Sequence, residues 1–417
     1  MKKIAIIGGG FAGIKLAGQL SGNDFEVWLF DKNNFFQFQP LFYQVATSGL
    51  EPSSISFPLR KLFQKKKNFH IRNEEVTKID AQANKLITAN NTYDFDNLVI
   101  ATGCTTNFFG NETIQNNAVP MKSVGEALYL RNFILINFEK ALNVPEEKKQ
   151  EYLNIVIVGG GPTGVEVSGA LAEMRKKILP KDYPEIDFKK MNIYLVESGD
   201  KTLGSMSEIS SKRSKEYLEK LGVNVFTSTQ VTDYNGEEVK FNNGKSIPTR
   251  TVIWAAGIKG NTIEGLNPEV ITRGNRIKVN RFSQVEGYDD IFALGDVAFM
   301  VSPKYPNGQP QVATVANDQA THLYKNLLNQ KNKAPMLEFE YNNKGSMATV
   351  GKNMAVVDLP KFSFQGFFAW LFWMFLHLML ILGVKNKILV FTNWVWKYFT
   401  SDQSLRLIIR PFERKKL

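Results

Sequence analysis

The sequence has little of the side-chain chemistry that disulfides and metal centres need. Its 417 residues include one cysteine, Cys104, and three histidines. A single cysteine excludes an internal disulfide framework and the paired redox cysteines of disulfide reductases. The histidines (His70, His322 and His377) are widely separated and have no cysteine partners, so no metal site is expected. His377 lies within an apolar run, where a packed core residue is the simpler interpretation and a ligand or proton donor is the alternative.

Acidic residues are also in deficit, with 40 Asp and Glu against 51 Lys and Arg and a formal net charge of +11. This excess suggests an acidic partner, for which nucleic acid is one candidate. Many of the basic residues gather around the very apolar last fifth of the chain, which favours anionic lipid and no nucleic acid. No secretory signal pattern is seen, so the catalytic parts are expected in the cytosol. No series of ionisable groups crosses an apolar segment, so proton pumping is not expected.

What the sequence does contain is a strand, glycine turn and helix at its start. The β-branched run at residues 3–7 is followed by Gly8, Gly10 and Gly13 in the pattern G-x-G-x-x-G, and then by a helical pattern of apolar residues. Such glycines permit a tight turn, close approach of a pyrophosphate and close helix packing. Asp31 ends the next strand, 18 residues beyond Gly13, where a carboxylate can accept hydrogen bonds from an adenosine ribose.

A second unit of the same kind begins at residues 154–158 and continues into Gly159, Gly161 and Gly164. Glu197 ends the next strand, 33 residues beyond Gly164, so a polar insertion is expected after the helix. A carboxylate at this place accepts from a free 2′-hydroxyl and repels a 2′-phosphate, which favours NAD over NADP. Two such units in one chain are far more specific than one, and they indicate a resident flavin and a visiting nicotinamide dinucleotide.

Three further strand ends carry small residues. Residues 98–100 run into Thr102 and Gly103, residues 252–254 run into Ala256 and Gly257, and residues 291–294 run into Gly295 and Asp296. The second dinucleotide unit is therefore inserted between strands of the first. We expect an α/β fold with two Rossmann-like dinucleotide-binding domains, in which an FAD domain (1–120 and 251–330) is interrupted by an NAD(H) domain (121–250), plus amphipathic membrane-attachment helices within 331–417.

The chain resembles the flavoproteins with two dinucleotide-binding domains over nearly its whole length. More narrowly, four stretches resemble the type II NADH dehydrogenases: residues 38–46, 159–173, 254–257 and 345–396. These are single-subunit, membrane-attached NADH:quinone oxidoreductases with non-covalent FAD. The resemblance implies hydride transfer from NADH to FAD and delivery of two electrons to a membrane quinone. It also implies the possibility of a homodimer formed through the tail.

The resemblance further implies which residues hold each ligand. Those implied for FAD are Gly8, Gly10, Phe11, Ala12, Gly13, Asp31, Lys32, Gln44, Thr102, Gly103, Gly295, Asp296, Ala313 and Thr314. Those implied for NADH are Gly159, Gly161, Pro162, Thr163, Gly164, Glu197, Ala256 and Gly257. Glu166 is implied to lie near the flavin, between the two substrates, and is the catalytic candidate for steering protons.

One stretch departs from the family pattern. The family carries glutamines in a helix that opens A-Q-x-[AG]-x-Q-[QEY]-G, and this sequence has Thr314 and Asp318 in their places, with only Gln319 in agreement. A short hydroxyl cannot reach where an amide reached, and a carboxylate is repelled by a developing quinol anion. Thr314, Asp318 and Gln319 are therefore the candidate quinone residues, and two alternatives stay open: a membrane-attached NADH oxidase or other-acceptor reductase, and a non-catalytic FAD-binding redox sensor.

The tail begins with an apolar run at residues 362–384, whose last 18 residues carry no charge. Lysines and tryptophans follow at once, which suits a helix in the headgroup layer, and the chain ends in basic residues, namely Arg406, Arg410, Arg414, Lys415 and Lys416. We favour monotopic attachment by two helices, on the cytoplasmic side of the inner membrane, over a true membrane span or a buried dimer core. The aromatic stretch at residues 33–46 is expected to be a loop, serving either as core or as a wall for the cofactor ring.

Overall fold

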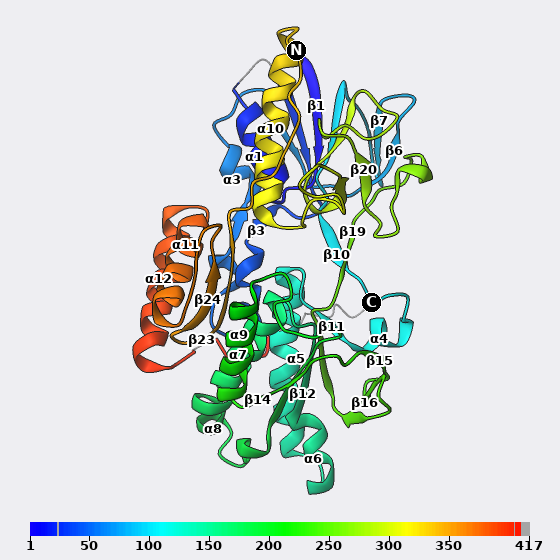
Figure 1. The fold of residues 1–417 in the computed structure, drawn as a ribbon. Coiled ribbons are helices and arrows are strands. Elements are labelled where there is room, and N and C mark those ends of the chain that lie inside the picture. The colour runs from blue at the N-terminus through cyan, green and yellow to red at the C-terminus, as the bar shows by residue number, and fades with distance from the viewer. Residues whose placement is uncertain (23–24, 404, 410–417) are drawn as a thin grey trace, which may run out of the picture. The chain divides into compact units, whose positions relative to one another are not determined.

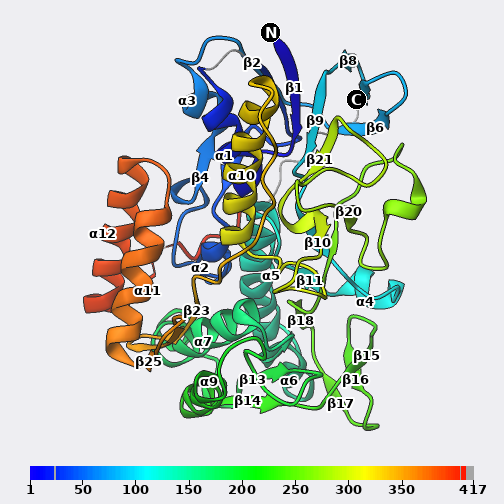
Figure 2. The same cartoon turned by 45° about the horizontal axis from the view of Figure 1, so that its top comes forward.

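The fold was analysed in a computed structural model that describes residues 1–22, 25–403 and 405–409 (Figures 1 and 2). The chain divides into two compact units. The first comprises Met1–Gln37, Phe57–Thr105 and Ile258–Asn343, and the second comprises Phe38–Ser56, Thr106–Gly257 and Lys344–Leu417. Strands β4 (Ser56–Pro58) and β10 (Cys104–Thr106) lie where the chain passes from one unit to the other.

The first unit is organised around a five-stranded parallel sheet in the order β21-β9-β1-β2-β5. Its strands are β21 (Ile291–Ala293), β9 (Asn97–Ile100), β1 (Lys2–Ile7), β2 (Phe25–Phe30) and β5 (Phe69–Arg72). Strand β1 is central because it is apolar throughout its inner part, and it pairs Ile6 with Leu29 on one side and with Val99 on the other. All the carboxyl ends of the strands therefore meet at one edge.

Helices α1 (Phe11–Leu20) and α10 (Ala313–Lys331) lie side by side in both ribbon views (Figures 1 and 2). Both carry small residues where they meet, so their backbones approach closely. The remaining elements of this unit are β3 (Phe35–Gln37), α3 (Leu59–Phe63), β6 (Val76–Asp80), β7 (Lys85–Thr88), β8 (Thr92–Asp94), β19 (Ile258–Gly260), β20 (Ile277–Val279) and β22 (Ala298–Met300).

The second unit repeats the plan with the parallel order β11-β18-β12-β13-β14. Its strands are β11 (Val119–Pro120), β18 (Thr251–Trp254), β12 (Asn154–Val158), β13 (Asn192–Val196) and β14 (Val223–Phe226). Strand β12 is buried along its whole length and pairs Val158 with Val196 and with Trp254. The strand order reverses direction at β12, which is where a doubly wound sheet offers its ligand crevice.

Helices cover this second sheet and extend beyond it. They are α2 (Phe42–Ala46), α4 (Glu112–Asn117), α5 (Val124–Leu142), α6 (Glu146–Leu153), α7 (Pro162–Lys177), α8 (Leu179–Asp182), α9 (Glu208–Lys220), α11 (Phe367–Leu380) and α12 (Val384–Thr400). Two antiparallel sheets complete the unit: β15 (Val231–Tyr234), β16 (Glu238–Phe241) and β17 (Ser246–Pro248), and then β23 (Ser346–Gly351), β24 (Met354–Asp358) and β25 (Ser363–Gln365).

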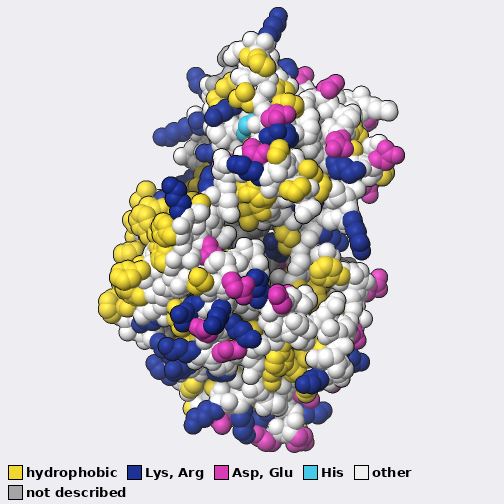
Figure 3. Space-filling view, viewed as in Figure 1, with side chains coloured by type: hydrophobic (Ala, Val, Ile, Leu, Met, Phe, Trp, Pro, Cys, Tyr) yellow, Lys and Arg dark blue, Asp and Glu magenta, His cyan; other side chains and the backbone are white. Residues whose placement is uncertain are grey.

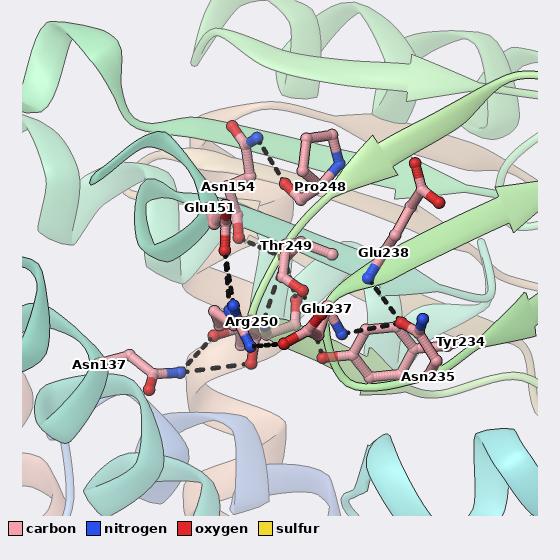
Figure 4. A network of polar contacts seen from close by, with 11 residues as sticks. Asn137, Glu151, Asn154, Tyr234, Asn235, Glu237, Glu238, Pro248, Thr249 and Arg250 are labelled. Atoms are coloured by element: carbon pink, nitrogen blue, oxygen red, sulfur yellow. Dashed lines mark hydrogen bonds and ion pairs between the residues drawn. The ribbon is translucent and has the colours of Figure 1, made fainter. Parts of the chain in front are cut away.

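A polar network ties the start of β18 to its neighbours (Figure 4). The Thr249 hydroxyl is fully buried and donates to the Asn154 carbonyl at 2.6 Å. The Arg250 guanidinium bridges Glu151 and Glu237 at 2.8 Å each. These contacts lie at the amino ends of the parallel strands, so they support the sheet and leave its carboxyl edge free for a ligand.

The expected α/β fold with two Rossmann-like domains and C-terminal helices is confirmed. One local expectation was wrong: residues 33–46 are not a continuous loop, because they contain β3 and helix α2 (Phe42–Ala46), whose residues are all buried. The insertion after α7 is present and includes α8. The predicted domain boundaries remain a prediction, and the basic residues Arg410, Arg414, Lys415 and Lys416 lie outside the described residues.

The Thr249 bond predicts a variant that is unstable but still binds nucleotide. Thr249→Val leaves the buried Asn154 carbonyl without its donor, which costs about 1–3 kcal/mol of unfolding free energy. Urea denaturation measures this loss, and the affinity for a dinucleotide should not change, because Thr249 lies at the edge of the sheet opposite to the glycine turn. Thr232→Val, an exposed threonine on β15, is the matched control and should change stability by less than about 0.5 kcal/mol. Equal midpoints for the two variants would contradict the assignment.

Candidate functional site

The first glycine turn joins β1 to α1 at the carboxyl edge of its sheet. Gly8 has a φ of +106°, and a Cβ there would lie 2.3 Å from the Ala101 carbonyl oxygen. A Cβ on Gly13 would lie 1.8 Å from the Gly8 carbonyl oxygen, whereas one on Gly10 would meet nothing within 4 Å. The turn is therefore closed on its protein side and open at Gly10, where α1 begins without a side-chain cap. A phosphate fits this opening.

Asp31 is fixed at the end of β2 beside this turn. One carboxylate oxygen accepts from the Gly9 N–H at 2.6 Å and the other from the Asn33 N–H at 2.6 Å. Burial raises the pKa of Asp31 above its ordinary value, although these two N–H groups act in the opposite direction. The sequence predicts that this acid meets an adenosine ribose, and the structure adds that two backbone N–H groups hold its carboxylate beside the glycine turn.

Other predicted cofactor residues gather at the same edge. The Gly295 N–H donates to the side-chain carbonyl of Gln319 at 2.7 Å, and a Cβ on Gly295 would lie 3.7 Å from that of Ala12. The Cys104 thiol donates to the Asp296 carboxylate at 3.0 Å. Segments separated by hundreds of residues in the sequence are thus brought together around the first turn. Gln44 belongs instead to the second unit.

The altered positions on α10 have definite surroundings. Thr314 shares a hydrogen bond of 2.8 Å with the Tyr341 hydroxyl, a residue that the sequence did not single out. Gln319 is 1% exposed and its side-chain carbonyl accepts the hydrogen bond from the Gly295 N–H, whereas Asp318 is partly exposed. The residue that agrees with the family pattern therefore supports the cofactor edge of this unit.

The second glycine turn has the same construction as the first. Gly159 has a φ of +110°, and a Cβ there would lie 2.7 Å from the Ala255 carbonyl oxygen. A Cβ on Gly164 would lie 1.9 Å from the Gly159 carbonyl oxygen, and one on Gly161 would meet nothing within 4 Å. Helix α7 begins at Pro162 without a side-chain cap. This turn, too, offers an open helix N-terminus to a phosphate.

Glu197 repeats the role of Asp31 at the end of β13. Its carboxylate accepts from the Gly160 N–H at 2.5 Å and from the Gly199 N–H at 2.6 Å. Ala256 and Gly257 follow β18, next to the turn. The residues predicted for NADH therefore lie along one edge of one sheet.

Glu166 lies one turn inside α7 and is 9% exposed. Burial raises its pKa well above the ordinary value, and the neighbouring Thr349 backbone and Trp373 side chain oppose this only in part. It lines a cavity of about 750 Å³, including the open mouth, within the second unit. Other lining residues are Tyr43, Gln44, Glu173, Thr349, Lys352, Trp373, Trp394 and Lys397.

The sequence missed most of this lining. The Gln44 side chain donates to the Tyr43 hydroxyl at 2.8 Å and accepts from the Trp394 indole at 2.7 Å. The prediction that Trp394 lies in the headgroup layer is wrong. Its side chain is 6% exposed and packs inward against α2. Lys397 likewise pairs with Glu173 at 3.5 Å. The sequence does not show which face of α12 packs inward, so it gave no indication of these two contacts.

The outer face of α11 and α12 is strongly apolar and appears as a continuous yellow area in Figure 3. Its exposed side chains include Phe367, Phe368, Leu371, Phe375, Met379, Ile388, Phe391, Trp396 and Phe399. A groove of about 890 Å³ between the helices shares Trp370, Met374, Trp394 and Tyr398 with the Glu166 cavity. Within residues 1–22, 25–403 and 405–409, no helix is long and apolar enough to span a membrane.

His377 lies on the inner face of α11. It is 9% exposed, its Nδ1 bonds the Trp373 carbonyl at 2.8 Å, and its ring stacks on that of Trp373 at 4.0 Å. Burial lowers the pKa of His377 to about 4, so the imidazole is neutral at pH 7. These contacts are those of a packed core histidine.

Two family models match the chain in tandem. The model for pyridine nucleotide-disulphide oxidoreductases matches residues 2–320, and that for the NDH2 C-terminal domain matches residues 343–402. The NDH2 structure from Plasmodium falciparum in complex with NADH aligns with 98% of this chain and with 100% of its own chain. The TM-score is 0.88 and the sequence identity is 22%. That likeness shows the fold.

Curated relatives extend the likeness to the sequence. A type II NADH:quinone oxidoreductase of Mycobacterium tuberculosis is 33% identical over 94% of this chain and 86% of the relative. Another, from Staphylococcus saprophyticus, is 30% identical over 85% of this chain and 89% of the relative. With both domains matched in order and at nearly full length, the chain belongs to the type II NADH:quinone oxidoreductases, within the pyridine nucleotide-disulphide oxidoreductase family.

Proposed function

We propose that the protein is an enzyme that oxidises NADH and passes two electrons to a membrane quinone through a resident FAD, without pumping protons. One observation carries this proposal: two glycine turns of the same construction, each closed by its own carboxylate, stand on separate sheets of one chain. Two turns can hold two dinucleotides at once. The names of the relatives support NADH and quinone as the substrates and do not favour an oxidase or a non-catalytic sensor.

FAD is assigned to the first unit. When bound, the flavin supplies hydride acceptance and release of two electrons. The open N-terminus of α1 would bind its pyrophosphate, and Asp31 would accept hydrogen bonds from its ribose. Asp296 would hydrogen-bond the sugar-alcohol chain, and the remaining residues named for FAD from the family resemblance, apart from Gln44 of the second unit, would line the same edge.

NADH is assigned to the second unit. The N-terminus of α7 would bind its pyrophosphate, and Glu197 would accept from the 2′-hydroxyl of its adenosine ribose. A 2′-phosphate would bring a second negative group against this carboxylate, so NADH is preferred over NADPH.

The quinone is assigned to the Glu166 cavity. The cavity shares four lining residues with the apolar groove between α11 and α12, so the two adjoin, and a lipophilic molecule would enter the cavity from the groove. A buried carboxyl with a raised pKa keeps its proton to higher pH and can donate it to a quinone oxygen. Thr314, Asp318 and Gln319 remain quinone candidates from the sequence.

A lipid surface on the cytoplasmic side of the inner membrane is the proposed location. The exposed aromatic and aliphatic side chains of α11 and α12 would enter the interfacial layer, with Lys385 and Lys387 beside anionic headgroups. A homodimer through the tail remains part of the proposal on family likeness alone.

The two carboxylates give a matched pair of variants with different outcomes. Asp31→Ala should yield colourless protein, because the resident FAD loses its ribose contact at the first turn. Glu197→Ala should purify yellow and show a KM for NADH raised about tenfold, with a smaller preference over NADPH. Flavin absorbance and steady-state kinetics measure both effects. Loss of flavin from the Glu197 variant would contradict the assignment of FAD to the first glycine turn and NADH to the second.

Anaerobic mixing tests the function and the role of Glu166 together. NADH should bleach the flavin absorbance of the wild type, and a menaquinone analogue should restore it. In Glu166→Gln, NADH should bleach the flavin absorbance at the normal rate. The menaquinone analogue should restore this absorbance at least about tenfold more slowly, because an amide cannot supply a proton. Wild-type turnover should fall as pH rises through the raised pKa of Glu166, a limb that the variant lacks. Equal restoration rates would remove Glu166 from the reaction, and a wild type that does not bleach would refute the function.

The membrane face predicts a variant that is active but detached. Phe368 and Phe375 are 75% and 61% exposed on α11. Phe368→Asp combined with Phe375→Asp should weaken binding to phosphatidylglycerol vesicles at least about 100-fold, since each buried phenylalanine contributes roughly 1.5–3 kcal/mol. Vesicle sedimentation measures binding, and Ile209→Asp on α9 is the exposed apolar control. Unchanged sedimentation of the double variant would place the membrane face elsewhere.

A further inference from the structure

The order of strands in the second sheet sets the direction of a bound dinucleotide. Glu197 follows β13, the Gly159 turn follows β12, and Ala256 and Gly257 follow β18. Since β12 lies between the other two strands, a dinucleotide with its adenosine ribose at Glu197 and its pyrophosphate at the turn must extend its nicotinamide half towards β18. Residues at the end of β18 are therefore those that meet the nicotinamide riboside.

Phe109 stands at this place. Its aromatic ring packs directly over Gly257, so that a Cβ on Gly257 would lie 2.5 Å from the ring Cζ. Gly257 has a φ of +74°, and both its conformation and its lack of a side chain are needed to admit the ring. Gly257 itself is among the residues predicted to contact NADH.

The backbone under this ring is held rigidly. The Trp254 indole donates to the Asn107 carbonyl at 2.9 Å, and the Asn107 N–H donates to the Gly257 carbonyl at 3.3 Å. Phe109 itself has a φ of +54° and donates its N–H to the Asn107 side chain at 2.9 Å. A left-handed phenylalanine is an uncommon, strained conformation, and such residues cluster where ligands are clamped.

The Phe109 side chain is mostly exposed to solvent. Phe109 is 69% exposed, whereas the neighbouring Phe108 packs its ring on Trp254 at 5.8 Å between centroids. Apart from its packing on Gly257, most of this aromatic ring lies in solvent, so the strained backbone gains little stabilisation from it in the free protein. The ring needs a partner with an apolar or aromatic face, and the sheet order brings the nicotinamide riboside to this place.

We propose that Phe109 is a substrate-binding residue that packs against the nicotinamide ring of NADH and orients it beside Gly257. The inference rests on the proposed function and deepens it, by dividing the binding of NADH into two parts. Glu197 and the glycine turn hold the adenosine and the phosphates, and Phe109 holds the half that carries the hydride. Only the nicotinamide half is sensitive to the ring.

ADP-ribose, which retains the adenosine, both phosphates and the second ribose but lacks nicotinamide, separates these parts. Phe109→Ala should raise the KM for NADH and the competitive inhibition constant of NAD by about 3- to 12-fold, the range of one aromatic contact. The inhibition constant of ADP-ribose should stay within about twofold, which also shows that the variant is folded. Phe109→Tyr should restore the wild-type values, and Tyr129→Ala, an exposed aromatic on α5, should change none of them.

Two results would overturn the inference while leaving the proposed function intact. Unchanged constants for NADH and NAD in Phe109→Ala would show that the ring does not touch the substrate. Equal weakening of NAD and ADP-ribose would show that the ring acts on a part of NAD that ADP-ribose retains, or on the fold of the edge, and not on the nicotinamide ring. A wild type whose flavin is not reduced by NADH would instead refute the proposed function itself, so the two failures are distinguishable.

Discussion

The structure depends on one interaction that occurs twice: a strand-end carboxylate that accepts from the second N–H of a glycine turn on the neighbouring strand. Asp31 does this at Gly9, and Glu197 does it at Gly160. Each bond needs a turn too tight for side chains at its first and last glycines, because a Cβ on Gly8 or Gly159 would strike the backbone of the next strand. Each bond fixes a carboxylate beside an open helix N-terminus, which is the arrangement a dinucleotide requires.

The second constraint is the burial of Glu166. A carboxyl removed from water costs free energy in its ionised form, so it stays protonated unless a charge compensates it. Its surroundings come from α2, near the start of the chain, and from β23 and α11, near its end. The C-terminal helices therefore serve two purposes: their inner face completes a cavity around Glu166, and their outer face presents apolar side chains (Figure 3).

This double use explains why the tail was only partly predictable. The two-helix arrangement follows from the apolar run and the stretch of lysines and tryptophans after it. The burial of Trp394 does not, because tryptophan beside lysine is equally typical of a membrane interface, and its partner Gln44 lies 350 residues away. In the same way, the substitution at Thr314 was visible, but its bond to Tyr341 was not.

The sequence by itself determined both glycine turns and their carboxylates, because each of these depends on residues close together in one strand-turn-helix unit. Only the tertiary structure decided which residues surround Glu166 and which face of α12 carries the buried Trp394. It also decided that Phe109 covers Gly257, which lies 148 positions further along the chain. The physical reason is the range of the interactions. Backbone geometry and helix dipoles act locally, so the spacing of residues along the sequence reveals them. Side-chain packing between distant segments is set instead by how the sheets and helices come together.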